Sequence, residues 1–337
     1  MSNLLKGNSK VFKPMRYEWA FEAYRKHESL HWLATEIPLA DDVADYKKAS
    51  PEVQKFIEDV MKLFTTNDIS ASQGYVGLLR IFKPIEITMM LSSFAAREAC
   101  HVDAYSLFTE TIGFDEDIYK EFLDIPVMSI KTTYLDKAKV KKYEDYKAMN
   151  LSDVELDKQY RRDVARMLAV YGGGLEGIEL FAQFALLLKF QFEGKFKGLG
   201  QIVDYSIKDE YQHQVNNSRL FREFIKENPD IWDDSLKYDI YQAIREIVAQ
   251  EDALIDHLKP PHASIEDCKQ YIRFQADNAL KLLGMKPNYG VEENPFPFME
   301  EITNGVSLVN FFEQRVTDYA KGALTGSWDE LKNKKTN

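Results

Sequence analysis

The fold follows from the segment Phe94-Ala-Ala-Arg-Glu-Ala-Cys-His-Val-Asp-Ala-Tyr-Ser-Leu-Phe108, in which Glu98 and His101 stand among apolar residues. Apolar residues keep helical spacing from Pro84 to Gly113 around this segment. These positions are Ile87, Met90, Leu91, Phe94, Ala95, Leu107 and Phe108. Residues three apart share one face of a helix, so Glu98 and His101 can point at the same position. The segment predicts a long helix, about seven turns, that presents a carboxylate and an imidazole together.

A second pair with the same spacing, Glu210 and His213, occurs later in the chain. Carboxylate oxygen and imidazole nitrogen suit iron or manganese better than calcium, so the two pairs indicate a site for two such ions. The spacing alone is weak evidence, because 54 acidic residues and 6 histidines in 337 predict about one such pair by chance. A third copy, Glu28 and His31, is interpreted as coincidental.

Two further acids stand in apolar surroundings: Asp68, which ends Leu63-Phe-Thr-Thr-Asn-Asp68, and Glu176, within Gly174-Leu-Glu-Gly-Ile178. An unpaired ionised carboxylate costs several kcal/mol in such surroundings, and a metal ion would neutralise it. Four carboxylates and two histidines from four helices match the known template of ferritin-like di-iron and di-manganese proteins. Buried salt bridges and helix caps stay open as alternatives, Asp68 as a C-terminal cap in particular. Glu179, three residues after Glu176, could be a spare ligand, but we expect it on a solvated face and leave it out of the site.

The rest of the chain predicts an all-α protein. Ser50 and Pro51 start a helix that runs past Phe64 toward Asp68, and short helices and connections are expected from Ile112 to Asp153. Further helices are expected at 156–193, 198–227, 236–258 and 264–283, the first interrupted at Gly172-Gly-Gly174. We predict an N-terminal segment 1–48, a ferritin-like helical domain 49–283 and a loosely attached tail 284–337.

Composition excludes several classes of function. The formal charge of −11 and pI near 5.2 argue against nucleic-acid binding. Residues 1–14 lack the apolar core of a signal peptide, and the most apolar stretch, Leu180 to Phe192, is too short to span a bilayer. The two cysteines, Cys100 and Cys268, form neither a CxxC pair nor a disulfide framework, so we expect a cytoplasmic protein without membrane attachment.

The motifs together resemble the small subunit of class I ribonucleotide reductase. The resemblance rests on Phe64-Thr-Thr-Asn-Asp68, Glu98-Ala-Cys-His-Val-Asp-Ala-Tyr105, Leu175-Glu-Gly-Ile178 and Lys208-Asp-Glu-Tyr-Gln-His213, and it spans Trp32 to Tyr319. It implies a dinuclear metal centre that reacts with oxygen or a reduced oxygen species to produce a stable radical. The ligands it implies are Asp68, Glu98, His101, Glu176, Glu210 and His213. Di-iron is the first expectation, with dimanganese or a mixed manganese–iron centre as alternatives.

The resemblance also implies the redox residues. Tyr105 would carry the radical, and it lies four residues after His101, on the same helix face and about 6 Å along the axis. Asp209 would hydrogen-bond His101, while Trp32 and Tyr319 would pass the radical to a cysteine of the large subunit, where ribonucleoside diphosphates are reduced. A homodimer is implied as well. Without the resemblance, these residues are an ordinary core tyrosine, a solvated acid, an interface tryptophan and a surface tyrosine.

Three features depart from the family pattern. Ser206 stands where an apolar residue is usual beside the pocket of the metal and the radical, and Lys208 replaces a more usual arginine. The chain ends in a basic sequence, so Trp328 could anchor the tail to the large subunit instead of an acidic, aromatic terminus. Two alternatives remain, a related dimetal oxidase or monooxygenase and a ferritin-like metal-binding protein. Neither uses Tyr105, Trp32 and Tyr319 together.

Overall fold

The computed structural model describes residues 2–6, 11–130, 140, 145, 149 and 151–303, and those residues include helices and no strand. This confirms the predicted all-α class. The chain divides into two compact units, Met1–Phe296 and Pro297–Asn337. The proposed divisions after residues 48 and 283 stay predictions.

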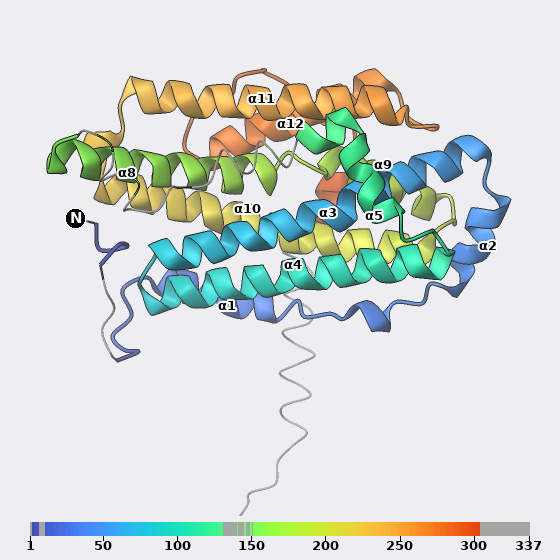
Figure 1. Cartoon of the computed structure of the whole chain (residues 1–337), viewed down its shortest axis with the longest axis horizontal. Helices are drawn as coiled ribbons and strands as arrows, with labels where there is room; N and C mark the ends of the chain where they lie inside the picture. Colours follow the sequence, from blue (N-terminus) through green and yellow to red (C-terminus); the bar gives the residue numbers. More distant parts are fainter. Residues whose placement is uncertain are drawn as a thin grey trace, which may run out of the picture. The chain divides into compact units, whose positions relative to one another are not determined.

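The first unit is a set of long helices with shorter helices before and between them (Figure 1). In chain order its helices are α1 (Glu18–Glu28), η1 (Ala34–Glu36), α2 (Ala40–Lys48), α3 (Pro51–Ile81), α4 (Ile85–Ile112), α5 (Ile118–Glu121), η2 (Phe122–Asp124), α8 (Asp153–Ala169), η3 (Val170–Leu175), α9 (Phe181–Phe192), α10 (Lys197–Glu227), η4 (Pro229–Ile231), α11 (Asp234–Leu258) and α12 (Ile265–Leu282). The predicted helices are all present, while α1 and α2 were not expected.

Helices α3 and α4 pack along each other over most of their length (Figure 1). The predicted start of α3 is confirmed, because the Val53 N–H donates to the Ser50 hydroxyl and Pro51 occupies the first position. The helix does not end near Asp68 but continues to Ile81, so the interpretation of Asp68 as a C-terminal cap is wrong. Helix α4 ends at Gly113, whose φ of 87° is the left-handed conformation that glycine adopts easily.

The predicted interruption at the three glycines is a π-helical segment, η3, between α8 and α9. Each glycine lies against a different neighbour: Gly172 against Asn217 of α10, Gly173 against Leu283, and Gly174 against Ile247 of α11. A Cβ atom at any of the three positions would come within 3.0 Å of that neighbour. The glycines therefore allow close packing where the helix loses its α-helical register.

Helix α10 is fixed at its N-terminal end by a side chain from α2. The Asp42 carboxylate accepts hydrogen bonds from the backbone N–H groups of Gly198 (3.0 Å) and Leu199 (2.8 Å). A carboxylate at this end also interacts favourably with the helix dipole. This contact holds in place the helix that carries Glu210 and His213.

Two further expectations concern the apolar stretch and the cysteines. Helix α9 has only 12 residues, and none of the helices in the described part of the chain is long and apolar enough to cross a membrane. Cys100 and Cys268 are both free thiols.

Candidate metal centre

The six predicted ligands come from four places in the helical unit. Asp68 lies on α3, Glu98 and His101 on α4, and Glu210 and His213 on α10. Glu176 follows the last residue of η3, so it lies at the end of the π-helical segment rather than within an α-helix. All six residues are buried, and each is at most 7% exposed. Groups this polar need partners when they are buried this deeply.

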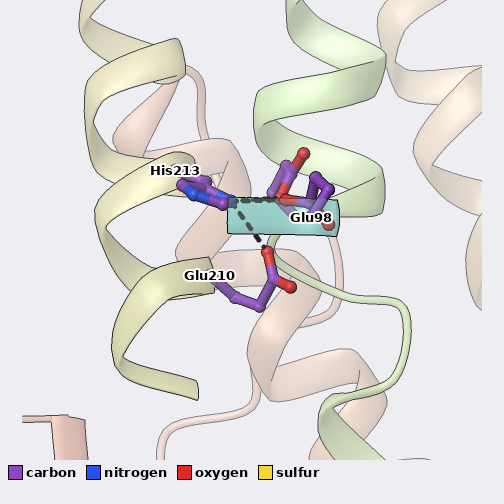
Figure 2. Close-up of side chains that lie close together, drawn as sticks. Glu98, Glu210 and His213 are labelled. Atoms are coloured by element: carbon purple, nitrogen blue, oxygen red, sulfur yellow. Dashed lines mark hydrogen bonds and ion pairs between the residues drawn. The ribbon is translucent and has the colours of Figure 1, made fainter. Parts of the chain in front are cut away.

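Four of the six form a compact group. Glu98, Glu176, Glu210 and His213 each offer a ligand atom, and these atoms all lie within 4.8 Å of one another. The Nδ1 atom of His213 lies 2.9 Å from Glu98 Oε1, 3.0 Å from Glu210 Oε2 and 3.2 Å from Glu176 Oε2. Figure 2 shows the carboxylates of Glu98 and Glu210 both directed toward this imidazole, with dashed lines that mark the two ion pairs.

His101 joins the group through the other oxygens of the same carboxylates. Its Nδ1 atom lies 3.1 Å from Glu210 Oε1 and 3.6 Å from Glu98 Oε2. Glu98 and Glu210 therefore each turn one oxygen toward His213 and the other toward His101. Two carboxylates that span two imidazoles are suited to two neighbouring metal ions.

Asp68 is not a member of the compact group of four, although it lies within the influence of its charges. Burial raises the pKa of Asp68 well above its ordinary value. The positive charge of His101 opposes this, and the negative charges of Glu98 and Glu210 add to it. Asp68 is therefore a buried carboxylate whose surroundings favour its neutral form when no metal ion is bound.

The charges of the site fit two divalent cations. Burial, and then the charge of Glu210, raise the pKa of Glu176 to about 7. Burial alone would lower the pKa of His213, but hydrogen bonds with Glu176, Glu210 and Glu98 raise it well above its ordinary value. Among the described residues, no hydrogen-bond donor reaches Asp68 Oδ2. Four buried carboxylates that lack sufficient positive charge, among them Asp68 with an oxygen that accepts no hydrogen bond in the part of the chain that the structure describes, are the arrangement that two divalent ions would neutralise.

The outer nitrogen of His101 leads to a predicted redox residue. Asp209 Oδ2 lies 3.2 Å from His101 Nε2 and accepts a hydrogen bond of 2.8 Å from the Trp32 indole N–H. The rings of Trp32 and His101 are stacked, with centroids 5.9 Å apart. Arg97 donates to the Trp32 carbonyl at 3.1 Å. A continuous set of contacts thus joins His101 to a buried tryptophan, with Asp209 holding the imidazole in orientation.

The outer nitrogen of His213 meets a residue that the sequence analysis missed. His27 on α1 is fully buried, and its Nε2 atom lies 3.2 Å from His213 Nε2 and 3.6 Å from Asp209 Oδ1. Burial lowers the pKa of His27 well below its ordinary value, which favours the neutral imidazole. A neutral imidazole can accept a hydrogen bond from His213 and so leave the Nδ1 atom of His213 for a metal.

Tyr105 is buried beside the site on α4, and its hydroxyl donates a hydrogen bond of 3.0 Å to Ser206 Oγ. Its ring contacts Phe64 edge to face at a centroid distance of 4.9 Å. Burial, and then the charge of Asp68, raise the pKa of Tyr105 above its ordinary value, so the phenol is protonated at neutral pH. Ser206, which departs from the family pattern, therefore supplies the polar contact of this tyrosine.

Glu179 is only 2% exposed, so the prediction that it lies on a solvated face is wrong. The turn that follows η3 directs it inward, where it accepts a hydrogen bond from Asn67. Glu28 and His31 are both exposed, away from the buried group. Tyr319 and Trp328 lie outside the described residues. Tyr75 was also missed, and its hydroxyl donates to Glu176 Oε1 at 2.7 Å.

Comparison with protein families gives a match to the model described as "Ribonucleotide reductase, small chain" over residues 9–295. A relative from Invertebrate iridescent virus 6, named "Probable ribonucleoside-diphosphate reductase small subunit 376L", is 36% identical, and the alignment covers 98% of this chain and 99% of the relative. The human "Ribonucleoside-diphosphate reductase subunit M2" is 27% identical over 96% of this chain and 79% of its own.

Solved structures show the same fold. A ribonucleotide reductase R2 subunit from Clostridium botulinum superposes with a TM-score of 0.77 at 18% identity, covering 88% of this chain and 91% of its own. The Rnr4 homodimer of Saccharomyces cerevisiae superposes with a TM-score of 0.73 at 22% identity, covering 95% and 93%. The dimanganese(II)-NrdF of Streptococcus sanguinis gives 0.70 at 19% identity, covering 88% and 100%.

Proposed function

The chain belongs to the ribonucleotide reductase small-chain family, and on this premise we propose that it holds two metal ions and stores a radical on Tyr105. One observation carries the two-metal part of the proposal. Glu98 and Glu210 each direct one oxygen toward His101 and the other toward His213. With Asp68 and Glu176, these residues are the proposed ligands.

The bound metal centre would supply the oxidant for Tyr105 after reaction with dioxygen or a reduced oxygen species. Oxidation of the phenol removes one electron and one proton. The Tyr105 hydroxyl donates to Ser206 Oγ, so Ser206 sets the direction in which the proton first leaves. The deep burial of the ring, against Phe64, excludes water that would otherwise quench a radical.

The proposed route of the radical leads from Tyr105 to Trp32, and His101 and Asp209 connect the metal site with Trp32. Its support is the hydrogen bond from the Trp32 indole to Asp209 and the contact of Asp209 with His101. Tyr319 is the proposed final residue in this chain, before a cysteine of a large subunit in which ribonucleoside diphosphates are reduced. Tyr105, Trp32 and Tyr319 would each give up an electron and a proton together when the radical passes through them.

The assembly and the metal are part of the same proposal. We expect the active enzyme, a ribonucleoside-diphosphate reductase, to require a large subunit, and the small subunit to be a cytoplasmic homodimer like the yeast Rnr4 structure. Di-iron is the proposed centre, with dimanganese, present in the Streptococcus sanguinis structure, or a mixed centre as alternatives. The ligand set accepts iron and manganese alike.

The test is electron paramagnetic resonance of metal-free protein loaded with Fe(II) or Mn(II) and then given its oxidant. We expect a tyrosyl radical signal that Tyr105→Phe abolishes while two metal ions per chain are retained. Tyr271→Phe is the matched control, since it removes a buried tyrosine hydroxyl from α12, which carries no proposed ligand. An unchanged radical signal in Tyr105→Phe would show that the assignment is wrong.

A further inference from the structure

A second buried tyrosine besides Tyr105 contacts the candidate metal site, next to Glu176 and His213. Tyr75 is on α3, seven residues or about two helical turns after Asp68. Its hydroxyl donates to Glu176 Oε1 at 2.7 Å and accepts a hydrogen bond of 2.8 Å from the side-chain amide of Asn217. Since the amide nitrogen only donates, the single phenol hydrogen is left for the carboxylate. The direction of the hydrogen bond to Glu176 is therefore defined.

This contact makes the two oxygens of Glu176 different. Oε1 is bound by the phenol, whereas Oε2 lies 3.2 Å from His213 Nδ1 and is the oxygen directed into the compact group. Glu98 and Glu210 behave differently, because both of their oxygens face imidazole nitrogens. Because Tyr75 occupies Oε1, Glu176 has one oxygen available for a metal ion, whereas Glu98 and Glu210 each have two.

The packing around Tyr75 leaves its ring little freedom. The residue is fully buried, and its ring lies edge to face against Phe94 and His213, at centroid distances of 5.7 Å and 5.6 Å. The neighbouring Gly74 has no Cβ, and the Tyr171 ring fills that space. Burial, and then the charge of Glu176, raise the pKa of Tyr75 well above its ordinary value, so the hydroxyl remains a donor.

Asn217 is packed as tightly as Tyr75. It lies four residues after His213 on α10, on the same helix face, and it is fully buried. Gly172 of η3 packs against it, where a Cβ atom would lie 2.6 Å from the Asn217 Cβ. The amide is therefore fixed relative to both the imidazole and the phenol.

We propose that Tyr75, oriented by Asn217, is a positioning residue that restricts Glu176 to binding metal through Oε2 alone. The proposal rests on the proposed function, because it assigns a role at the same metal centre. The phenol stabilises the ionised carboxylate and keeps Oε1 from turning toward the metal. It thereby sets the affinity of the site for the metal ion beside His213, without itself being a ligand.

The experiment is a titration of metal-free, full-length protein with Mn(II) under anaerobic conditions, with free Mn(II) measured by electron paramagnetic resonance. The wild type should bind two ions per chain. Tyr75→Phe should still bind two, one of them roughly 10- to 100-fold more weakly, the usual effect of removing a partner of a metal ligand. Tyr271→Phe should match the wild type. Metal-induced changes in the infrared carboxylate bands should show a monodentate carboxylate in the wild type that becomes bidentate in Tyr75→Phe.

Asn217→Leu keeps the phenol and removes the group that orients it. This variant should lower the affinity for the same Mn(II) ion by a smaller factor than Tyr75→Phe. It replaces Tyr75→Phe as the test if that variant does not fold. Two ions bound with wild-type affinity by the folded variants would overturn the positioning role and leave the proposed function standing. A wild type that binds no Mn(II) and no Fe(II) would instead overturn the proposed function itself.

Discussion

Replacing Glu176 by glutamine should make the metal-free protein more stable at alkaline pH while it impairs metal binding. Glu176 is 5% exposed, and burial, followed by the charge of Glu210, raises its pKa from 4.5 to about 7. In the unfolded chain the carboxylate returns to its ordinary pKa. Folding at pH 8 therefore forces a charged group into a site that favours its neutral form, and glutamine removes that requirement.

The magnitude follows from the difference between the two pKa values. A raised pKa contributes stability that is fully present below pH 4.5 and is lost as the pH rises through about 7. The difference of about 2.5 units, at about 1.36 kcal/mol each, gives a loss of about 3 kcal/mol by pH 8 and about 1 kcal/mol at pH 5. Glu176→Gln should thus stabilise the metal-free protein by about 3 kcal/mol at pH 8 and by much less at pH 5.

The assay is urea denaturation in the presence of a chelator at both pH values. Glu22→Gln, at an exposed position of α1, is the control and should change the free energy of unfolding little at either pH. Addition of Mn(II) should reverse the order at pH 8, because only the wild type retains the charged ligand. An equal effect of Glu176→Gln at pH 5 and pH 8, or a loss of stability at pH 8 without metal, would refute the reasoning.

Three further changes have defined outcomes. Ser206→Ala removes the acceptor of the Tyr105 hydroxyl, so a buried polar group loses its partner. Chemical denaturation should show a free energy of unfolding lower by about 1–3 kcal/mol. An unchanged value would show that the hydrogen bond does not stabilise the fold. Asp42→Ala leaves two N–H groups at the start of α10 without their acceptor and should cost about 1–2 kcal/mol, whereas Asp41→Ala, at an exposed position, should cost little. Tyr319→Phe should keep the radical yield and eliminate nucleotide reduction with the large subunit, and retained turnover would contradict the proposed route.

The two Glu–His pairs of the site could be predicted from the sequence because they depend only on the spacing of residues along a helix. Glu98 with His101, and Glu210 with His213, each lie one turn apart on a long helix, and the apolar residues around them predict burial. The interruption at Gly172 could be predicted because glycine disfavours a helix.

The errors came from features that depend on the folded structure. Residues 69–80 contain polar residues and two glycines, so the pattern did not show that α3 continues past Asp68 to Ile81; in the structure, Tyr171 packs against Gly74. The inward position of Glu179 depends on the turn after η3. The contacts of Tyr75 with Glu176 and of His27 with His213 join residues more than 100 positions apart, and neither carries a local pattern.

The three glycines of η3 have a consequence for how this sequence can diverge. Gly173 and Gly174 face the side-chain ends of Leu283 and Ile247, so a side chain gained at either glycine requires a smaller residue at that partner. Changes at these two positions should therefore occur as correlated pairs among homologous sequences, whereas Gly172, which faces the Cβ and backbone of Asn217, should stay glycine. A gain or loss of one residue in the segment should be rarer still, because it would rotate Glu176 by about 100° around the helix axis, away from the other ligands.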